Sequence, residues 1–187
     1  MRILIFSDLH ANWEALCALR AVEPQPDGII FLGDAVGYGP EPKVCLTWLR
    51  HHVQFAVRGE HDLAVADRIE DDWPPGEREI ALACRDYTRR MLDEGDLAYL
   101  RGLPEQQVVD LGGARFCLVH KQPVTPLSRP SSSGEGSTFD LPLPLGEGWG
   151  EGIILAGHTH LPEIRRVGQA VLVNPGSLGQ PRHGSPS

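Results

Sequence analysis

The sequence lacks any closely spaced pair of cysteines. Its four cysteines stand far apart, at Cys17, Cys45, Cys84 and Cys117. Without a C-x-x-C pair, neither a thiolate metal site nor a disulfide framework is expected. We therefore expect four reduced thiols without a metal or catalytic role, as in a cytoplasmic protein.

Long apolar stretches are missing as well. No segment approaches the roughly 18 to 20 apolar residues that a membrane-spanning helix needs. The opening segment, MRILIFSDLH, is a short apolar run interrupted by Asp8, with neither a long hydrophobic region nor a small-residue cleavage site. These features predict neither a signal peptide nor a membrane anchor.

Positive charge is also scarce. Lys and Arg number 17 against 25 Asp and Glu, which gives a formal net charge of −8. Such a chain is not expected to bind a nucleic-acid backbone or an anionic membrane surface unaided, although local charges can still steer a small anionic substrate. The length of 187 residues suits one domain with a substantial core.

Short apolar runs alternate with helical patterns along the chain. The runs are Ile3 to Phe6, Ile29 to Leu32, Phe55 to Val57, Phe116 to Val119, Ile153 to Ala156 and Ala170 to Val173. Continuous runs of this kind are typical of strands buried on both faces. Helical spacing is found over Asn12 to Ala21, Val44 to His51 and Arg78 to Leu92, with a shorter helix near Leu97 to Arg101. The alternation predicts a single α/β sandwich domain over residues 1–187.

One segment departs from this pattern. Residues 123–152 are rich in Pro, Ser, Gly and Glu, and they contain the near-repeats Gly134-Glu135-Gly136, Gly146-Glu147-Gly148 and Gly150-Glu151-Gly152. The segment has little helical or strand periodicity, which is unusual inside a compact domain. We interpret it as a low-complexity, disordered insert without activity of its own.

Metal-binding residue types come directly after five of the six apolar runs. The segments are Ser7-Asp8-Leu9-His10, Gly33-Asp34, Arg58-Gly59-Glu60-His61-Asp62, His120 and Gly157-His158-Thr159-His160. Open α/β sheets place their ligand crevice at the carboxyl ends of strands. Residues two apart in an extended segment point the same way, so Asp8 with His10, and His158 with His160, can each present two ligands to one side.

The chemistry of these side chains indicates divalent metal ions. Imidazole and carboxylate groups without thiolate favour Mn, Fe or Zn over Cu(I) or iron–sulfur clusters. The candidates outnumber the ligands that one ion takes, so we expect two ions that share a bridging carboxylate. His51, His52 and His183 lie in a helix end or the tail and are expected to be solvated.

In these motifs the sequence resembles the calcineurin-like metallophosphoesterases, and within them the small bacterial and archaeal phosphodiesterase-like branch. The family pattern D-x-H, G-D, G-N-H-[DE], H and G-H-x-H is matched at Asp8/His10, Gly33/Asp34, Gly59/His61/Asp62, His120 and Gly157/His158/His160. Further matches are Gly37-Tyr38-Gly39-Pro40 and Asn174-Pro175-Gly176-Ser177. The resemblance spans residues 1–121 and 153–182.

The resemblance implies a four-layer αββα sandwich that holds two divalent ions, with Mn first and Fe, Zn, Ni or Mg as alternatives. Asp34 would bridge the ions. One ion would take Asp8, His10 and His160, and the other would take residue 60, His120 and His158. Paired ions about 3.5 to 4 Å apart clamp a phosphoryl oxygen and activate a bridging hydroxide as the nucleophile.

The resemblance also assigns catalytic roles beside the metals. His61 would protonate the leaving alkoxide or neutralise its charge, and Asp62 would orient the imidazole. Arg58 either contacts the substrate phosphate or pairs with a surface acid. Hydrolysis of phosphomonoesters or phosphodiesters is the leading hypothesis. The alternatives are a catalytically weak or inactive scaffold of the same fold and a serine/threonine protein phosphatase.

Three features depart from the family pattern. Position 60 is Glu where the family has Asn, and an ionised carboxylate has no N–H to donate to a phosphate. Three carboxylates opposite two divalent ions leave one net positive charge, whereas Asn at position 60 would leave two, so Glu60 is expected to lower turnover. The low-complexity segment follows His120 closely, so His120 is expected to be held less firmly than the other ligands. The chain ends soon after Ser177, and we expect an exposed sheet edge that favours a homo-oligomer.

Overall fold

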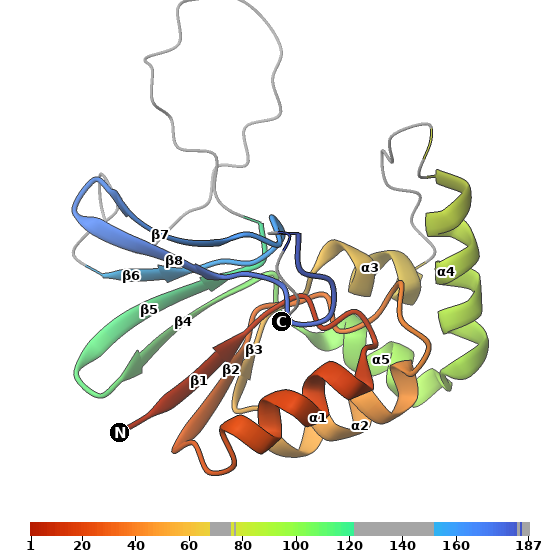
Figure 1. The fold of residues 1–187 in the computed structure, drawn as a ribbon, viewed down its shortest axis with the longest axis horizontal. Helices are drawn as coiled ribbons and strands as arrows, with labels where there is room; N and C mark the ends of the chain where they lie inside the picture. Colours follow the sequence, from red (N-terminus) through yellow and green to blue (C-terminus); the bar gives the residue numbers. More distant parts are fainter. Residues whose placement is uncertain (68–75, 77, 122–151, 183, 185–187) are drawn as a thin grey trace, which may run out of the picture.

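A computed structural model describes residues 1–67, 76, 78–121, 152–182 and 184. Five helices and eight strands are found in these residues (Figure 1). In chain order they are β1 (Ile3–Phe6), α1 (Trp13–Val22), β2 (Gly28–Phe31), α2 (Pro42–His52), β3 (Phe55–Ala56), α3 (Glu60–Asp67), α4 (Arg78–Met91), α5 (Glu94–Gly102), β4 (Gln106–Leu111), β5 (Ala114–Val119), β6 (Ile153–Leu155), β7 (Pro162–Val167) and β8 (Ala170–Pro175).

All six predicted strands and all four predicted helices are present. The structure adds α3, β4 and β7, which the sequence patterns did not predict. Strand β7 reads PEIRRV, with charged side chains among its apolar ones, so it is not an apolar run. Helix α3 is short, and its buried side chains include Asp62 beside small apolar residues, so it shows no clear apolar stripe.

The strands form two sheets that face each other. One sheet is parallel, with the order β1-β2-β3, and the other is mixed, with the order β4-β5-β6-β8-β7. Because successive strand residues point to opposite faces, Ile30 and Leu32 pack between the sheets against Leu118 and Leu155, whereas Phe31 points to the helices. The sheets and the helices therefore form one domain, and the predicted α/β sandwich is confirmed.

The helices lie on the outer face of the three-stranded sheet (Figure 1). Residues of α1, α2, α3 and α5 share one hydrophobic cluster with this face, and α4 packs outside against α3. On the outer face of the five-stranded sheet, Val119, Ile154 and Leu172 form a third buried cluster. The described residues place no helix there. The connection between β5 and β6 lies almost entirely outside the described residues, as does the predicted insert up to residue 151.

The composition predicted neither a membrane-spanning helix nor a disulfide framework. No described helix combines the length and the apolar character that crossing a bilayer requires. None of the four cysteines forms a disulfide bond, and Cys45 is fully buried.

Candidate metal centre

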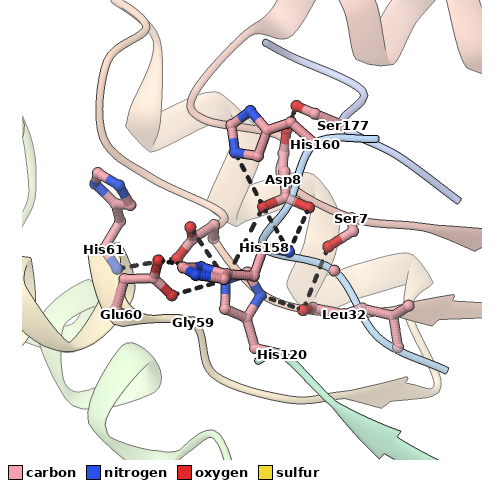
Figure 2. A network of polar contacts seen from close by, with 12 residues as sticks. Ser7, Asp8, Leu32, Gly59, Glu60, His61, His120, His158, His160 and Ser177 are labelled. Atoms are coloured by element: carbon pink, nitrogen blue, oxygen red, sulfur yellow. Dashed lines mark hydrogen bonds and ion pairs between the residues drawn. The ribbon is translucent and has the colours of Figure 1, made fainter. Parts of the chain in front are cut away.

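All seven predicted metal ligands meet at one place, where strands from both sheets end. Figure 2 shows five of them together, namely Asp8, Glu60, His120, His158 and His160. Asp8 and His10 follow β1, Asp34 follows β2, and Glu60 begins α3 just after β3. His120 follows β5, and His158 with His160 follows β6. The parallel strands deliver these residues to the same edge of the sandwich, which explains why segments far apart in sequence form one cluster.

Among the described residues, four overlapping groups of three side chains come close enough to hold an ion, and the two groups without Asp34 divide the other six candidate ligands between them. Potential ligand atoms of Asp8, His10 and His160 lie within 4.8 Å of one another, as do those of Glu60, His120 and His158. Asp34 stands between the groups, because its Oδ2 is 3.9 Å from Nε2 of His10 and 3.2 Å from Nε2 of His120. This is the grouping that the family resemblance implies.

The backbone is unusual at these positions. Five ligand residues have a left-handed conformation: Asp8 (φ 54°), His10 (φ 48°), Asp34 (φ 59°), His158 (φ 71°) and His160 (φ 60°). For residues other than Gly this conformation costs about 1 to 2 kcal/mol each. Strain of this kind persists where the surrounding fold over-determines it, and it tends to gather at functional sites.

Three of the ligand histidines are oriented by backbone carbonyl groups. Nδ1 of His10 lies 3.2 Å from the carbonyl oxygen of Val36, Nδ1 of His120 2.6 Å from that of Leu32, and Nδ1 of His160 2.7 Å from that of Gln180. A carbonyl oxygen accepts, so each Nδ1 donates its N–H. In the neutral rings the lone pair then lies on Nε2, which is how metal-binding histidines are usually held.

The arrangement of the Nε2 atoms fits a cation. Nε2 of His10 and Nε2 of His160 are 3.1 Å apart. With both Nδ1 atoms protonated and both rings neutral, two lone pairs face each other, and a positive ion between them would relieve the repulsion. Asp34 Oδ2, Glu60 Oε2 and His120 Nε2 are also buried and face one another, with His120 Nε2 3.2 Å from Asp34 Oδ2 and 2.8 Å from Glu60 Oε2. Such groups at the centre of a cluster are the donors that a metal ion would satisfy.

Burial shapes the ionisation of the cluster. Burial raises the pKa of Asp34 to about 8, although the imidazole of His120 opposes the shift. Burial by itself would lower the pKa of His120, but the carboxylates of Asp34 and Glu60 raise this pKa well above the usual value. Glu60 shows the opposite balance, because burial would raise its pKa while His120 and His158 hold it well below the usual range. The raised pKa of His120 and the lowered pKa of Glu60 have a common cause, the pairing of the two side chains at 2.8 Å.

Two glycines allow the ligand loops to approach so closely. A Cβ atom on Gly59 would lie 2.0 Å from Oδ1 of Asp34, and one on Gly157 would lie 2.0 Å from Oγ of Ser7. Both contacts are impossible, so only Gly fits at these positions. The sequence pattern includes both glycines, and the structure supplies the reason for them.

His61 lies beside the first group of ligands. Its ring centroid is 5.0 Å from that of His10 and 4.8 Å from that of Tyr38. Burial lowers the pKa of His61 to about 4, so the ring is neutral near pH 7 in the metal-free protein. The backbone N–H of His61 donates to Oδ1 of Asp34 over 2.9 Å, which helps to fix the carboxylate of Asp34.

Asp62 and Arg58 make contacts other than those that the family resemblance implies. The Asp62 carboxylate accepts backbone N–H groups from four residues, namely Asp34, Ala35, Val36 and Gly59. Asp62 thus holds the loop that presents Asp34. The family resemblance implies a different role, in which Asp62 orients the imidazole of His61. The Arg58 guanidinium binds Glu105 at 2.9 Å and donates to the carbonyl of Arg101. This is the surface-acid alternative, and these contacts do not support the substrate-binding role.

Several supporting residues had no role in the sequence analysis. Ser177 Oγ donates to the Asp8 carbonyl oxygen over 2.8 Å, and Asn174 Nδ2 donates to the carbonyl oxygen of Gly157 over 2.8 Å. The Asn174-Pro175-Gly176-Ser177 motif was noted as a family match, and this was the only signal for it. His51 and His52 hydrogen-bond within α2 and stay outside the cluster, as predicted. His183 lies outside the described residues.

Comparison with known proteins identifies the superfamily of the chain. The family model described as the calcineurin-like phosphoesterase superfamily domain matches residues 1–187. The chain belongs to this superfamily. The metallophosphoesterase of Sphaerobacter thermophilus is 30% identical, with a TM-score of 0.67 over 99% of this chain and 80% of that one.

Two further relatives are archaeal. An uncharacterised protein of Methanocaldococcus jannaschii is 28% identical over 200 residues, which cover 97% of this chain and 78% of the relative. A hypothetical protein from Pyrococcus horikoshii of known structure is 21% identical, with a TM-score of 0.70 over 95% of this chain and 77% of that one, and this likeness shows the fold alone.

Proposed function

We propose that this phosphoesterase hydrolyses phosphomonoesters or phosphodiesters with two divalent ions, manganese first among them. The observation that carries the proposal is the pair of ligand groups with Asp34 between them. Asp8, His10 and His160 would hold one ion, and Glu60, His120 and His158 the other. When bound, such ions supply an activated water and neutralise negative charge on the phosphoryl group.

Exposure differs between the two groups and supports a direction of substrate approach. The side chains of Asp8, His10 and His160 are at most 4% exposed, whereas that of His158 is 41% exposed and that of Glu60 15%. His120 is only 3% exposed, so the second group reaches solvent through His158 and Glu60. A small phosphoester would enter from this side, with no need for the basic surface that a nucleic-acid partner requires.

His61 would act on the leaving group. Its neutral imidazole can donate an N–H hydrogen bond to the leaving oxygen without a change of charge. A bound phosphate anion would raise the pKa of the ring, since a nearby negative charge favours imidazolium, and the ring could then donate a proton. Asp62 would contribute indirectly, through the backbone that presents Asp34.

The decisive test measures metal-dependent hydrolysis. Purified protein is assayed with bis-p-nitrophenyl phosphate and p-nitrophenyl phosphate, with Mn²⁺ or Ni²⁺ and with EDTA, alongside elemental analysis. We expect turnover that needs metal, that His120→Ala abolishes and that His51→Ala leaves unchanged. A protein that retains two bound ions but hydrolyses neither substrate would be the scaffold alternative. Activity on a phosphoserine peptide alone would indicate the protein phosphatase.

A further inference from the structure

Strand β7 forms one edge of the five-stranded sheet and pairs with β8 on one side only (Figure 1). None of the described strands pairs with its other side. In the middle of β7 the apolar residue Ile164 is 77% exposed, more than any other large apolar side chain of the described residues. An open strand edge offers unpaired backbone N–H and C=O groups to a further strand. Strand β7 is therefore a candidate interaction surface.

The hydrogen bonds of β8 show which backbone groups of β7 point outward. The N–H of Val171 and the C=O of Val173 bond to the β6 side of the sheet, so they point away from β7. In an antiparallel pair, residues that stand opposite each other point their backbone groups either both inward or both outward. Ile164 stands opposite Val173, and Arg166 stands opposite Val171. The N–H and C=O groups of Ile164 and Arg166 are therefore the ones at the open edge.

Two opposite charges flank Ile164 on the other face of the strand. Nε of Arg165 is 3.0 Å from Oε1 of Glu163, and both side chains are more than a third exposed. Many proteins protect an open edge with charged side chains, which repel a second strand when their signs are the same. In an antiparallel copy of β7 centred on Ile164, however, Glu163 stands opposite Arg165 of the copy, and Arg165 stands opposite Glu163 of the copy. The edge is thus complementary to itself, and opposite charges across a strand pair stabilise the pair.

We infer that β7 joins two copies of this chain edge to edge, in an antiparallel pair with a two-fold axis at Ile164. The N–H and C=O groups of the two Ile164 residues bond each other, and each Arg166 N–H donates to the C=O of Pro162 in the other copy. Pro162 has no N–H, and this register uses only its C=O. The two Ile164 side chains meet at the axis, with their Cα atoms about 5.5 Å apart. The same patch serves both copies, as two-fold symmetry requires.

Other registers of the same strand fit less well. An axis at any of the three charged residues of β7 sets two like charges opposite each other. An axis at Pro162 removes both central N–H donors, and an axis at Val167, the last residue of β7, leaves most of the strand unpaired. The axis at Ile164 combines a central apolar contact, opposite charges and full use of the strand. None of these residues belongs to the candidate metal centre, so the pairing does not depend on the proposed function.

Charge swaps test this pairing by analytical ultracentrifugation of the full chain. A single strand pair is a small interface, so we expect a weak dimer that forms as the protein concentration rises. Glu163→Arg leaves only arginines at the two positions, and Arg165→Glu leaves only acids, so each variant alone should dimerise about tenfold more weakly. An equimolar mixture of the two variants should recover the original association, and so should the chain that carries both substitutions.

Two controls separate this edge from the rest of the sheet. Arg115 is also an exposed, ion-paired strand residue, but it lies in β5, so Arg115→Glu should leave dimerisation unchanged. Ile164→Lys sets two ammonium groups opposite each other at the axis and should weaken the dimer. Val108→Lys, at an exposed position of the opposite edge strand β4, should not.

A chain that stays monomeric at every concentration overturns the inference. Association that survives Ile164→Lys but not Val108→Lys places the contact at β4 and also overturns it. The same holds for a mixture of the two charge-swap variants that does not recover association although circular dichroism shows both to be folded. If one single swap is misfolded, Ile164→Lys and the chain with both swaps decide by the same measurement.

Discussion

Single carbonyl groups and single carboxylates set up the candidate metal centre. The carbonyls of Val36, Leu32 and Gln180 orient three histidines so that their Nε2 atoms converge. Other side chains hold the backbone of the ligand loops, as Asp62 does when its carboxylate accepts the N–H of Asp34. Two residues in particular allow this arrangement to be tested.

Glu60 is predicted to limit turnover. Its carboxylate lies 2.8 Å from Nε2 of His120 and 2.6 Å from Nδ1 of His158, so it adds negative charge where a phosphate must bind. Glu60→Asn would restore a neutral amide with an N–H donor and should raise kcat/KM about tenfold at saturating Mn²⁺. Glu60→Gln is the control, because it removes the same charge but keeps the length of the side chain. An equal or lower kcat/KM for Glu60→Asn would remove the idea.

Asp62 is predicted to matter for stability. Asp62→Asn would place an amide N–H group opposite backbone donors that now bind a carboxylate oxygen. We expect the free energy of unfolding to fall by about 1.5 to 3 kcal/mol, the range for hydrogen bonds to charged groups. Urea denaturation measures the change. Asp67→Asn, at the exposed end of the same helix, should cost much less, and equal losses would contradict the prediction.

At the scale of elements, the site depends on the turn at the end of each strand. The turns after β1, β2 and β6 carry the left-handed residues, so the strand ends are strained while the strands themselves are regular. Helix α1 begins close behind the first of these turns. Asn12, the N-cap residue of α1, joins this helix to the segment around Gly179.

Asn12 links α1 to the segment that supports Asp8. Its Oδ1 accepts the N–H of Ala15 over 3.0 Å, and its Nδ2 donates to the carbonyl oxygen of Gly179 over 3.0 Å. Asn12→Ala should lower the free energy of unfolding by about 1 to 2 kcal/mol. Asn12→Ser keeps a capping oxygen and should lose less. If both variants melt like the original protein, the cap contributes nothing.

Helix α5 should make stability fall in acid. The ammonium group of Lys43 holds the pKa of Asp93, the N-cap residue, below its ordinary value of 3.8. A lowered pKa means that this stabilisation is present above about pH 4 and is lost as the pH falls through the lowered value. Asp93→Asn keeps the capping oxygen without the charge. Its Tm should lie below that of the original protein at pH 6, and the difference should shrink at pH 3. A constant difference would argue against the ion pair.

At the scale of the whole molecule, the two ligand groups join separate layers. The first combines Asp8 and His10 from the three-stranded sheet with His160 from the five-stranded sheet. The second combines Glu60 of α3 with His120 and His158 from the five-stranded sheet. Each ion would therefore connect the two halves of the sandwich.

Metal is accordingly predicted to stabilise the fold. An ion at 100 times its Kd adds about 2.7 kcal/mol to the free energy of unfolding, which corresponds to roughly 5 to 10 °C in Tm for a chain of this size. Thermal melts with Mn²⁺ and with EDTA measure the shift. His120→Ala should abolish most of it, and His51→Ala should not. A Tm that does not respond to Mn²⁺ would contradict metal binding at this site.

The sequence by itself determined which residues gather at the candidate metal centre. Apolar runs and the polar residues at their ends are local patterns, so the positions of Asp8, Asp34 and His120 at strand ends could be predicted from the chain alone. The same patterns could not predict β7 or α3, because neither carries a clear apolar pattern.

Only the tertiary structure decided how those residues are used. The backbone N–H of His158 reaches the carboxylate of Asp8 across 150 positions of sequence, and such pairing depends on how the two sheets are laid together. The same applies to Asp62 on the Asp34 loop and to Arg58 on Glu105. Local patterns are set by neighbours in the chain, whereas these contacts are set by strand order and by packing between layers.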